Sequence, residues 1–399
     1  MTEVAPRALG ARCHGVPIVN LVRAALAAVV LPALLAQEPA APSATVLRVS
    51  VVARHAEHCW QLYAACERGG EALLAAVEAF LLAPDEAHLQ AARDAWCKAR
   101  LVYGETEALR FQGGPIEPLE PLLNAWPVDE AYIDHVVGRP DAGIVHDLAR
   151  FPVLDAGLLE VANERGSEAN VSVGWHAIEF LLWGQDLDAH GTGRRPASDF
   201  ASSGGVPAER RRLYLRLVTQ RLVEHLRTLH RAWLPDAAWR RAFVADPDRA
   251  VLAMLTGAAI LSAFELCGER LAVAYETQDQ EQEHSCFSDT TWHDLQANQR
   301  GITAVLAGGP GTPTDAPTLL RLLQQRDAAA AEHLAATLAK TTAALAAIPA
   351  PFDQAFLGAD DAPGRRAIHA AMRALEEQAE AIAIAGKLFG HDLPMRPGH

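Results

Sequence analysis

The sequence is poor in aromatic residues and in positive charge. Phenylalanine, tryptophan and tyrosine make up 6% of its 399 residues, and 35 lysines and arginines face 49 aspartates and glutamates, which gives a formal net charge of -14. An acidic protein without a long basic run is a poor binder of nucleic acid. The composition therefore argues against DNA or RNA as a partner.

Cysteine is scarce, and no two cysteines form a C-x-x-C pair. Because Cys13 falls in an N-terminal segment that resembles an export signal, five cysteines remain, and an odd number leaves at least one unpaired within the chain. The spacing excludes a zinc finger and a haem attachment site. The remaining interpretations are that the cysteines are buried small residues or that two of them form one long-range disulfide. The five are Cys59, Cys66, Cys97, Cys267 and Cys286.

Several enzyme signatures and all clear strand patterns are also missing. There is no H-E-x-x-H, Walker loop, dinucleotide fingerprint or G-x-S-x-G, and no convincing alternation of period two. Alanine and leucine dominate at helical spacing, which predicts an all-α protein. We expect two helical-bundle domains, at 45–240 and 241–399. The longer helices are expected at 49–81, 84–111, 174–188, 208–233, 246–279, 318–347 and 363–389.

The N-terminus has the pattern of a secretory signal. Arg7 and Arg12 precede the apolar run "AALAAVVLPALLA" at 24–36, which is too short to span a bilayer. The pattern predicts a signal peptide at 1–36 and an exported protein, periplasmic or associated with the cell envelope. No later segment is predicted to span a membrane.

One nearly apolar stretch, "GWHAIEFLLWGQDLD" at 174–188, contains His176 and Glu179. In a helix these two would share one face with Trp183 and Asp186. A buried carboxylate without a partner is costly, so Glu179 requires a cation or a hydrogen bond. The pattern alone also fits a core histidine that is bonded to a carboxylate.

A second polar stripe lies on the helix expected at 84–111. Trp96, Arg100, Tyr103, Glu107 and Arg110 recur at spacings of four, three, four and three. A ladder of buried ion pairs would explain the stripe, but such ladders are seldom kept for stability alone. Two inward polar stripes predict a shared polar site.

A third cluster is "QEHSCFSDTTWHD" at 282–294. Ser288 or Asp289 fits the N-cap of a following helix, but this does not account for the adjacent Glu283 and His284. Imidazole and carboxylate groups together suit iron or zinc.

The segment "GWHAIEFLLWGQD" resembles the G-x-H-x-x-E signature of the imelysin family at Gly174, His176 and Glu179. Four further segments resemble imelysin blocks in the order of the family: "ARLVYGETEALRFQGGPI", "LNAWPVDEAYIDHV", "LTGAAILSAFELCGERL" and "EHSCFSDTTWHDL". The resemblance implies an exported helical protein of two domains with the signature at their interface. It also implies a metallopeptidase family with iron-regulated members and relatives of iron-uptake components. The sequence departs from the family before His293, where Thr290, Thr291 and Trp292 stand.

The first hypothesis is an exported metal-binding protein of iron acquisition or homeostasis, whose partners are the metal ion and iron-uptake components of the envelope. Its ligands would be His176, Glu179, Glu107 and His284, with iron or zinc as the cofactor. The supporting residues would be Arg100, Tyr103, Arg110, Glu283 and Asp289.

Two other hypotheses remain open. A metallopeptidase would use Glu179 as the catalytic base or as a ligand, and a non-metal protein would bind an organic ligand or a protein in the same polar region. In every case we expect a metal, Arg100 or Arg110 to neutralise Glu179. If His176 titrates normally, metal binding should weaken between roughly pH 6.5 and 5.

Overall fold

The computed structural model describes residues 43–188 and 190–397, and this part of the chain is built from helices. Within it, the only pairing of extended backbone outside helices is an isolated bridge between Val136 and Arg139. The prediction of an all-α protein is therefore confirmed. The predicted signal peptide at 1–36 lies outside the described residues.

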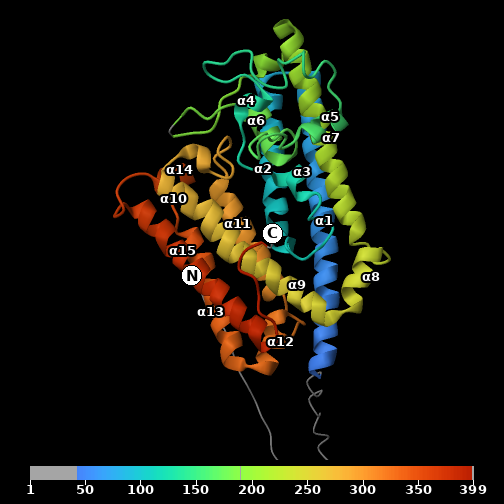
Figure 1. Ribbon diagram of the computed structural model, residues 1–399, viewed down its shortest axis with the longest axis vertical. Helices are drawn as coiled ribbons and strands as arrows, with labels where there is room; N and C mark the ends of the chain where they lie inside the picture. Colours follow the sequence, from blue (N-terminus) through green and yellow to red (C-terminus); the bar gives the residue numbers. More distant parts are fainter. Residues whose placement is uncertain (1–42, 189, 398–399) are drawn as a thin grey trace, which may run out of the picture. The chain divides into compact units, whose positions relative to one another are not determined.

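Three long helices that precede residue 233 pack side by side (Figure 1). α1 (Ala44–Leu82) contacts α2 (Glu86–Gly104) along one face and α7 (Gly205–Ala232) along another. Buried residues recur along α1 at helical spacing, from Leu47 to Leu81, and they form the seam. The side chain of Asp85 accepts a hydrogen bond from the backbone N–H of His88 and caps α2.

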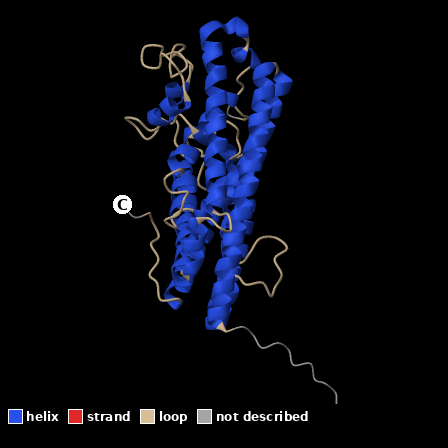
Figure 2. Cartoon of the chain, turned by 90° about the vertical axis from the view of Figure 1, so that its right-hand side faces the viewer, coloured by secondary structure: helices blue, strands red, loops and turns tan. Residues whose placement is uncertain are grey.

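The chain between α2 and α7 is irregular and carries short helices, as the tan loops of Figure 2 show. Of these helices α6 is the most buried, because all of its ten residues are shielded from solvent. The short helices are η1 (Glu105–Leu109), α3 (Glu120–Asn124), α4 (Glu130–Ile133), α5 (Ala156–Ala162), α6 (Gly174–Trp183), η2 (Ala197–Phe200) and η3 (Ser202–Gly204).

The second half is also helical, with α13 and η4 both packed against α15. The helix expected at 318–347 is two helices, because the chain breaks at Asp327, which caps the second of them. The elements are α8 (Ala238–Ala245), α9 (Pro247–Ile260), η4 (the π-helical Leu261–Ala272), α10 (Val273–Thr277), η5 (Gln280–Gln282), α11 (Thr291–Leu306), α12 (Leu319–Arg326), α13 (Ala328–Ala346), α14 (Phe352–Phe356) and α15 (Pro363–Leu388).

The continuous helix Pro247–Thr277, which comprises α9, η4 and α10, is long and apolar enough to cross a membrane. However, 67% of its most apolar window is buried inside the protein. It packs against α1, α11 and α15. This burial is what the core helix of a bundle requires.

Elements from the two halves of the chain interleave. α1 contacts α9 and α12, while α11 contacts α2 and η1, and the described residues 43–188 and 190–397 belong to one compact unit. The division into domains at 45–240 and 241–399 stays a prediction. The packing of α11 against α2 brings the third polar cluster of the sequence close to the second.

Candidate functional site

Helix α6 begins where only glycine fits. Gly174 has a φ of +86°, and a Cβ at this position would lie 2.5 Å from the carbonyl oxygen of Leu123 in α3. The glycine of the G-x-H-x-x-E pattern therefore lets the start of α6 approach α3. The helix ends at Trp183, before Gly184 with a φ of +71°. Asp186 thus lies beyond the helix, and the expectation that it shares a helical face with Glu179 is wrong.

His176 and Glu179 form a buried pair. The Nδ1 atom of His176 lies 2.8 Å from Oε2 of Glu179, and neither residue is more than 1% exposed. The other carboxylate oxygen of Glu179 accepts hydrogen bonds from the backbone N–H of Ser288 at 3.0 Å and from its hydroxyl at 2.6 Å. Burial raises the pKa of Glu179 to about 8, although these hydrogen bonds oppose the rise.

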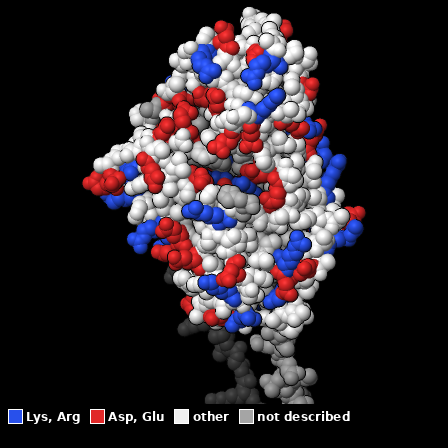
Figure 3. Space-filling model, viewed as in Figure 1, with Lys and Arg blue, Asp and Glu red and all other residues white. Residues whose placement is uncertain are grey.

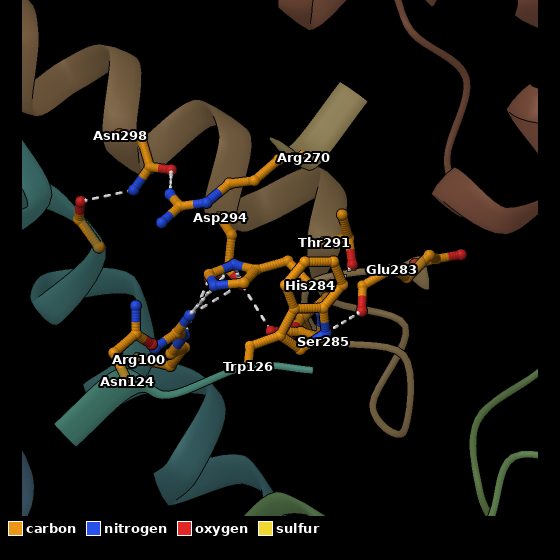
Figure 4. A network of polar contacts seen from close by, with 12 residues as sticks. Arg100, Asn124, Trp126, Arg270, Glu283, His284, Ser285, Thr291, Asp294 and Asn298 are labelled. Carbon is orange, nitrogen blue, oxygen red and sulfur yellow. Dashed lines mark hydrogen bonds and ion pairs between the residues drawn. The ribbon is translucent and has the colours of Figure 1, made fainter. Parts of the chain in front are cut away.

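Arg100 from α2 lies beside two imidazole rings. Its Nη2 atom is 3.4 Å from Nε2 of His176 and 3.3 Å from Nδ1 of His284, and the ring centroids of the two histidines are 4.9 Å apart. Asp294 of α11 contacts Nε of Arg100 at 3.2 Å and Nδ1 of His284 at 3.3 Å (Figure 4). Arg100 therefore forms its ion pair with Asp294, and it acts on Glu179 only through its charge, without a hydrogen bond. A metal at Glu179, the other partner expected from sequence, stays a prediction.

The charges of this group differ from those of isolated side chains. Burial and Arg100 hold the pKa of His176 well below its usual range, and burial with Arg270 lowers that of His284 to about 3. Burial alone would raise the pKa of Asp294, but Arg100 and His284 hold it far below its ordinary value. Both imidazoles are thus neutral and Asp294 is ionised at physiological pH. Protonation of His176 between pH 6.5 and 5, as expected from sequence, does not agree with this environment.

Glu107 is connected to the two histidines through Asn124 and Arg100. Its Oε2 atom is 2.6 Å from Arg270 and 3.0 Å from Arg110, and its Oε1 accepts a hydrogen bond from Asn124, which in turn accepts one from Arg100. Burial would raise the pKa of Glu107, but Arg110 and Arg270 lower it to about 2. The ion-pair ladder that the sequence suggested as an alternative is present here.

The other predicted residues divide between two places. The aromatic ring of Tyr103 lies under Arg100, with 5.6 Å from the guanidinium carbon to the ring centroid. Glu283 precedes His284 in the chain, but its carboxylate points away from the histidines in Figure 4. Asp289 lies within hydrogen-bonding reach of Asp186 and contributes nothing to the contacts of His176 and His284.

Sequence reasoning missed four members of the group: Asn124, Arg270, Ser288 and Asp294. Ser288 and Asp294 belong to the crowded stretch at 282–294 and were visible there. Asn124 and Arg270 stand in two of the segments that resemble imelysin blocks, but no periodicity marks them, and the packing of α3 and η4 brings them to the site.

A model of the imelysin family matches residues 61–382 of the chain. The chain belongs to the imelysin family. The G-x-H-x-x-E pattern of the sequence lies in α6 and contains the buried pair of His176 and Glu179.

Among imelysin relatives, iron-regulated protein A of Synechococcus elongatus is 25% identical over 302 residues, which is 73% of each chain. The crystal structure of a candidate iron-regulated protein A precursor from Parabacteroides distasonis has a TM-score of 0.69 and 18% identity, over 88% of this chain and 97% of the other. An imelysin-like protein from Psychrobacter arcticum has a TM-score of 0.61 and 16% identity, over 90% and 99%. The two crystal structures support the fold.

A cavity of about 140 Å³ lies between α2 and the start of α11, beside Arg100. Arg100, Asp294 and His293 line it together with Cys97. The guanidinium of Arg100 therefore separates this cavity from the two imidazoles. His293, to which the family pattern gave no secure role, lies at the cavity and not beside His176.

A second group of metal-ligand types lies elsewhere and was missed in the sequence. Ligand atoms of Asp134, His135 and His146 lie within 4.8 Å of one another. The carboxylate of Asp134 is clamped by Arg195 at 2.8 Å and by Arg211 at 2.9 Å. Arg195 and His135 also line a cavity of about 470 Å³.

Proposed function

We propose that this chain is an exported protein that binds a transition metal ion, iron in the first place, through His176 and His284. Support for iron comes from the iron-regulated relatives, and support for export comes from the signal-like segment at 1–36 and from the precursor form of one relative. The ion is cargo of the protein in this proposal.

The observation that carries the proposal is the arrangement of the two neutral imidazoles. Glu179 holds Nδ1 of His176, which leaves Nε2 turned toward His284 and Arg100. A carboxylate bonded to one ring nitrogen orients the other for a metal. Two imidazoles with nearby carboxylates suit first-row transition ions. The donor set fits such an ion, with Asp294 as the nearest anionic oxygen.

Arg100 must move for an ion to contact both rings, because its guanidinium lies within 3.4 Å of each. The adjoining cavity of about 140 Å³ gives it room. Asp294 is already ionised, so its negative charge would then balance the metal ion, as it balances Arg100 when no metal is bound. We therefore propose that the metal and the guanidinium of Arg100 compete for one position.

Glu107 and Glu179 take different roles in this proposal. Arg110, Arg270 and Asn124 contact the two carboxylate oxygens of Glu107. Glu107 therefore orients these side chains, and it would bind a metal only if these contacts broke. Glu179 is fully buried and holds His176 and Ser288. A peptidase would need Glu179 to face a water on an open metal position, and we therefore place metal binding ahead of peptidase activity.

Calorimetric titration with Fe²⁺ and Zn²⁺, together with elemental analysis, tests the proposal on the mature protein. The double variant His176→Ala/His284→Ala should lose the high-affinity site. His225→Ala is the matched control, because His225 is a buried histidine bonded to Glu160 at 2.8 Å in another part of the bundle. Equal metal binding by the double variant and the parent would overturn the assignment.

A further inference from the structure

Two glutamates from distant segments share the same pair of arginines beside the histidine site. The Oε2 atom of Glu107 lies 3.0 Å from Nη1 of Arg110 and 2.6 Å from Nη2 of Arg270. The Oε2 atom of Glu265 lies 3.3 Å and 3.5 Å from the same two nitrogens. Glu265 therefore already contacts both of the guanidinium groups that hold Glu107.

The π-helical form of η4 brings Glu265 and Arg270 together. Backbone hydrogen bonds of a π-helix join residues five apart, whereas neighbours on an α-helix are three or four apart. Glu265 and Arg270 are five residues apart and in contact. The side chain of Glu265 is 14% exposed, while Glu107 is 1% exposed. Of the two glutamates that share the arginines, Glu107 is thus the inner one.

These side chains include one more carboxylate than guanidinium group. Glu120 of α3 contacts Nη2 of Arg110 at 3.3 Å, so three glutamates share two arginines. Burial and repulsion from Glu107 and Glu265 raise the pKa of Glu120 to about 7, although Arg110 opposes the rise. If Glu107 left, two carboxylates would remain for two guanidinium groups. Its departure would therefore avoid the cost of leaving a buried charge without a partner.

We propose that Glu265 is a positioning residue of the metal site. When a metal ion binds, Glu265 keeps the two arginines paired, and Glu107 turns toward the ion as a further ligand. This role rests on the proposed metal site at the two imidazoles. The amide of Asn124 donates to Glu107 at 3.4 Å and accepts from Arg100, whose guanidinium occupies the proposed position of the metal. Asn124 thus connects Glu107 directly to that position.

The charge of the ion favours the release of Glu107. A divalent ion and Arg100 together carry three positive charges, whereas Asp294 and an ionised Glu179 would supply two negative ones. Buried charges are costly unless they are paired, and Glu107 supplies the third negative charge. The surface also favours the approach of a cation, because acidic side chains gather around a hollow on the face seen in Figure 3 and the formal net charge is -14.

Calorimetric titration with Zn²⁺ tests the role of Glu265. Glu265→Gln should bind Zn²⁺ about tenfold more weakly than the parent, because both arginines then stay with Glu107. Glu269→Gln is the matched control, since Glu269 is a half-buried glutamate on the same helix, and it should bind as the parent does. Glu107→Gln should itself weaken binding, and adding Glu265→Gln to it should weaken binding no further, because no ligand is left to release.

Melting in the presence of a chelator tests the replacement without a metal. Glu107→Gln should melt close to the parent, because Glu265 and Glu120 remain with the two arginines. The double variant Glu107→Gln/Glu265→Gln leaves one carboxylate for two guanidinium groups, and it should melt several degrees below either single variant. A Glu107→Gln variant that melts as low as the double variant would show that Glu265 cannot replace Glu107.

The titrations separate this inference from the function on which it rests. Unchanged Zn²⁺ affinity in Glu265→Gln would overturn the role of Glu265 and leave the histidine site in place. Losses of affinity that multiply in the double variant would show that Glu265 acts independently of Glu107, which also overturns the proposal. Absence of Zn²⁺ binding in the parent, or equal binding by His176→Ala/His284→Ala, would instead refute the metal site itself.

Discussion

Two groups of buried polar side chains can be compared: the histidine site at His176 and His284, and the group of Asp134, His135 and His146. Both contain imidazole, carboxylate and guanidinium groups, but the guanidinium groups are arranged differently around the carboxylates. Asp134 is one carboxylate clamped by two guanidiniums, from Arg195 and Arg211. In the histidine site Arg100 faces the ionised Asp294. Arg270, which also acts on His284, is paired with Glu107. Metal-ligand residues that lie close together are therefore insufficient to indicate a metal site. The charge already present around them decides whether a cation is attracted.

This comparison assigns different roles to the two groups. Arg195 and Arg211 neutralise Asp134 and join the loop at 134–135 to the start of α7. In the histidine site the two imidazoles are neutral, and Glu179 has a pKa of about 8, so it holds a proton that a cation can replace. We therefore propose that the first group stabilises the fold and that the second binds the ligand.

The largest effect should come from Asp134→Asn. This change leaves two buried guanidiniums without their carboxylate, and breaking a buried ion pair from one side costs about 3–5 kcal/mol. We expect the free energy of unfolding in urea to fall by that amount, while metal binding by the folded protein is unchanged. Asp141→Asn is the exposed control. A loss of metal affinity with little loss of stability would reverse the roles of the two groups.

Glu179→Gln should mainly affect metal binding. The amide introduced by this change cannot become negatively charged beside Nδ1 of His176 when a metal binds, and removing such a carboxylate partner lowers metal affinity about 10–100-fold. The control is Glu160→Gln, because Glu160 bonds His225 at 2.8 Å in a similar pair away from the site. Calorimetry should separate the two variants. Unchanged affinity in Glu179→Gln would remove Glu179 from the metal site.

The pH dependence of stability distinguishes the sites further. The pKa of Glu179 is raised from 4.5 to about 8 in the folded protein, so the folded state binds more protons than the unfolded state between these values. Stability must therefore fall as pH rises from about 4.5 to 8. In metal-free protein, the difference in unfolding free energy between Glu179→Gln and the parent should grow in favour of the variant over this range. A difference that stays constant with pH would show that Glu179 is ionised throughout.

The sequence predicted the helical class and the principal residues of the histidine site for physical reasons. His176 and Glu179 stand out because polar groups are costly in an apolar helix, and Arg100 and Glu107 follow the buried spacing of one segment. The pairing of charges was beyond prediction, because it depends on contacts between distant elements. Arg270 reaches Glu107 from η4, and Asp294 takes the arginine that was expected to neutralise Glu179.

The same limitation explains the missed group at Asp134. Its partners Arg195 and Arg211 lie about 60 and 77 residues along the chain, and no periodicity links them. The end of α6 at Gly184 was also missed. As a result, Asp186 was placed on the helix face of Glu179, whereas it lies beyond the end of the helix.

The smallest effect is expected from His135→Ala. His135 contacts Asp134 at 3.1 Å, but its side chain is 38% exposed, and two guanidiniums already neutralise the carboxylate. A partly exposed contact of this kind contributes roughly 0–1 kcal/mol, so the urea midpoint should hardly change. The number of metal ions bound should not change either, because a cation gains little beside Arg195 and Arg211. If His135→Ala instead removed one bound ion per chain, the arginines would have to open to admit metal. Charge balance would then no longer separate the two groups.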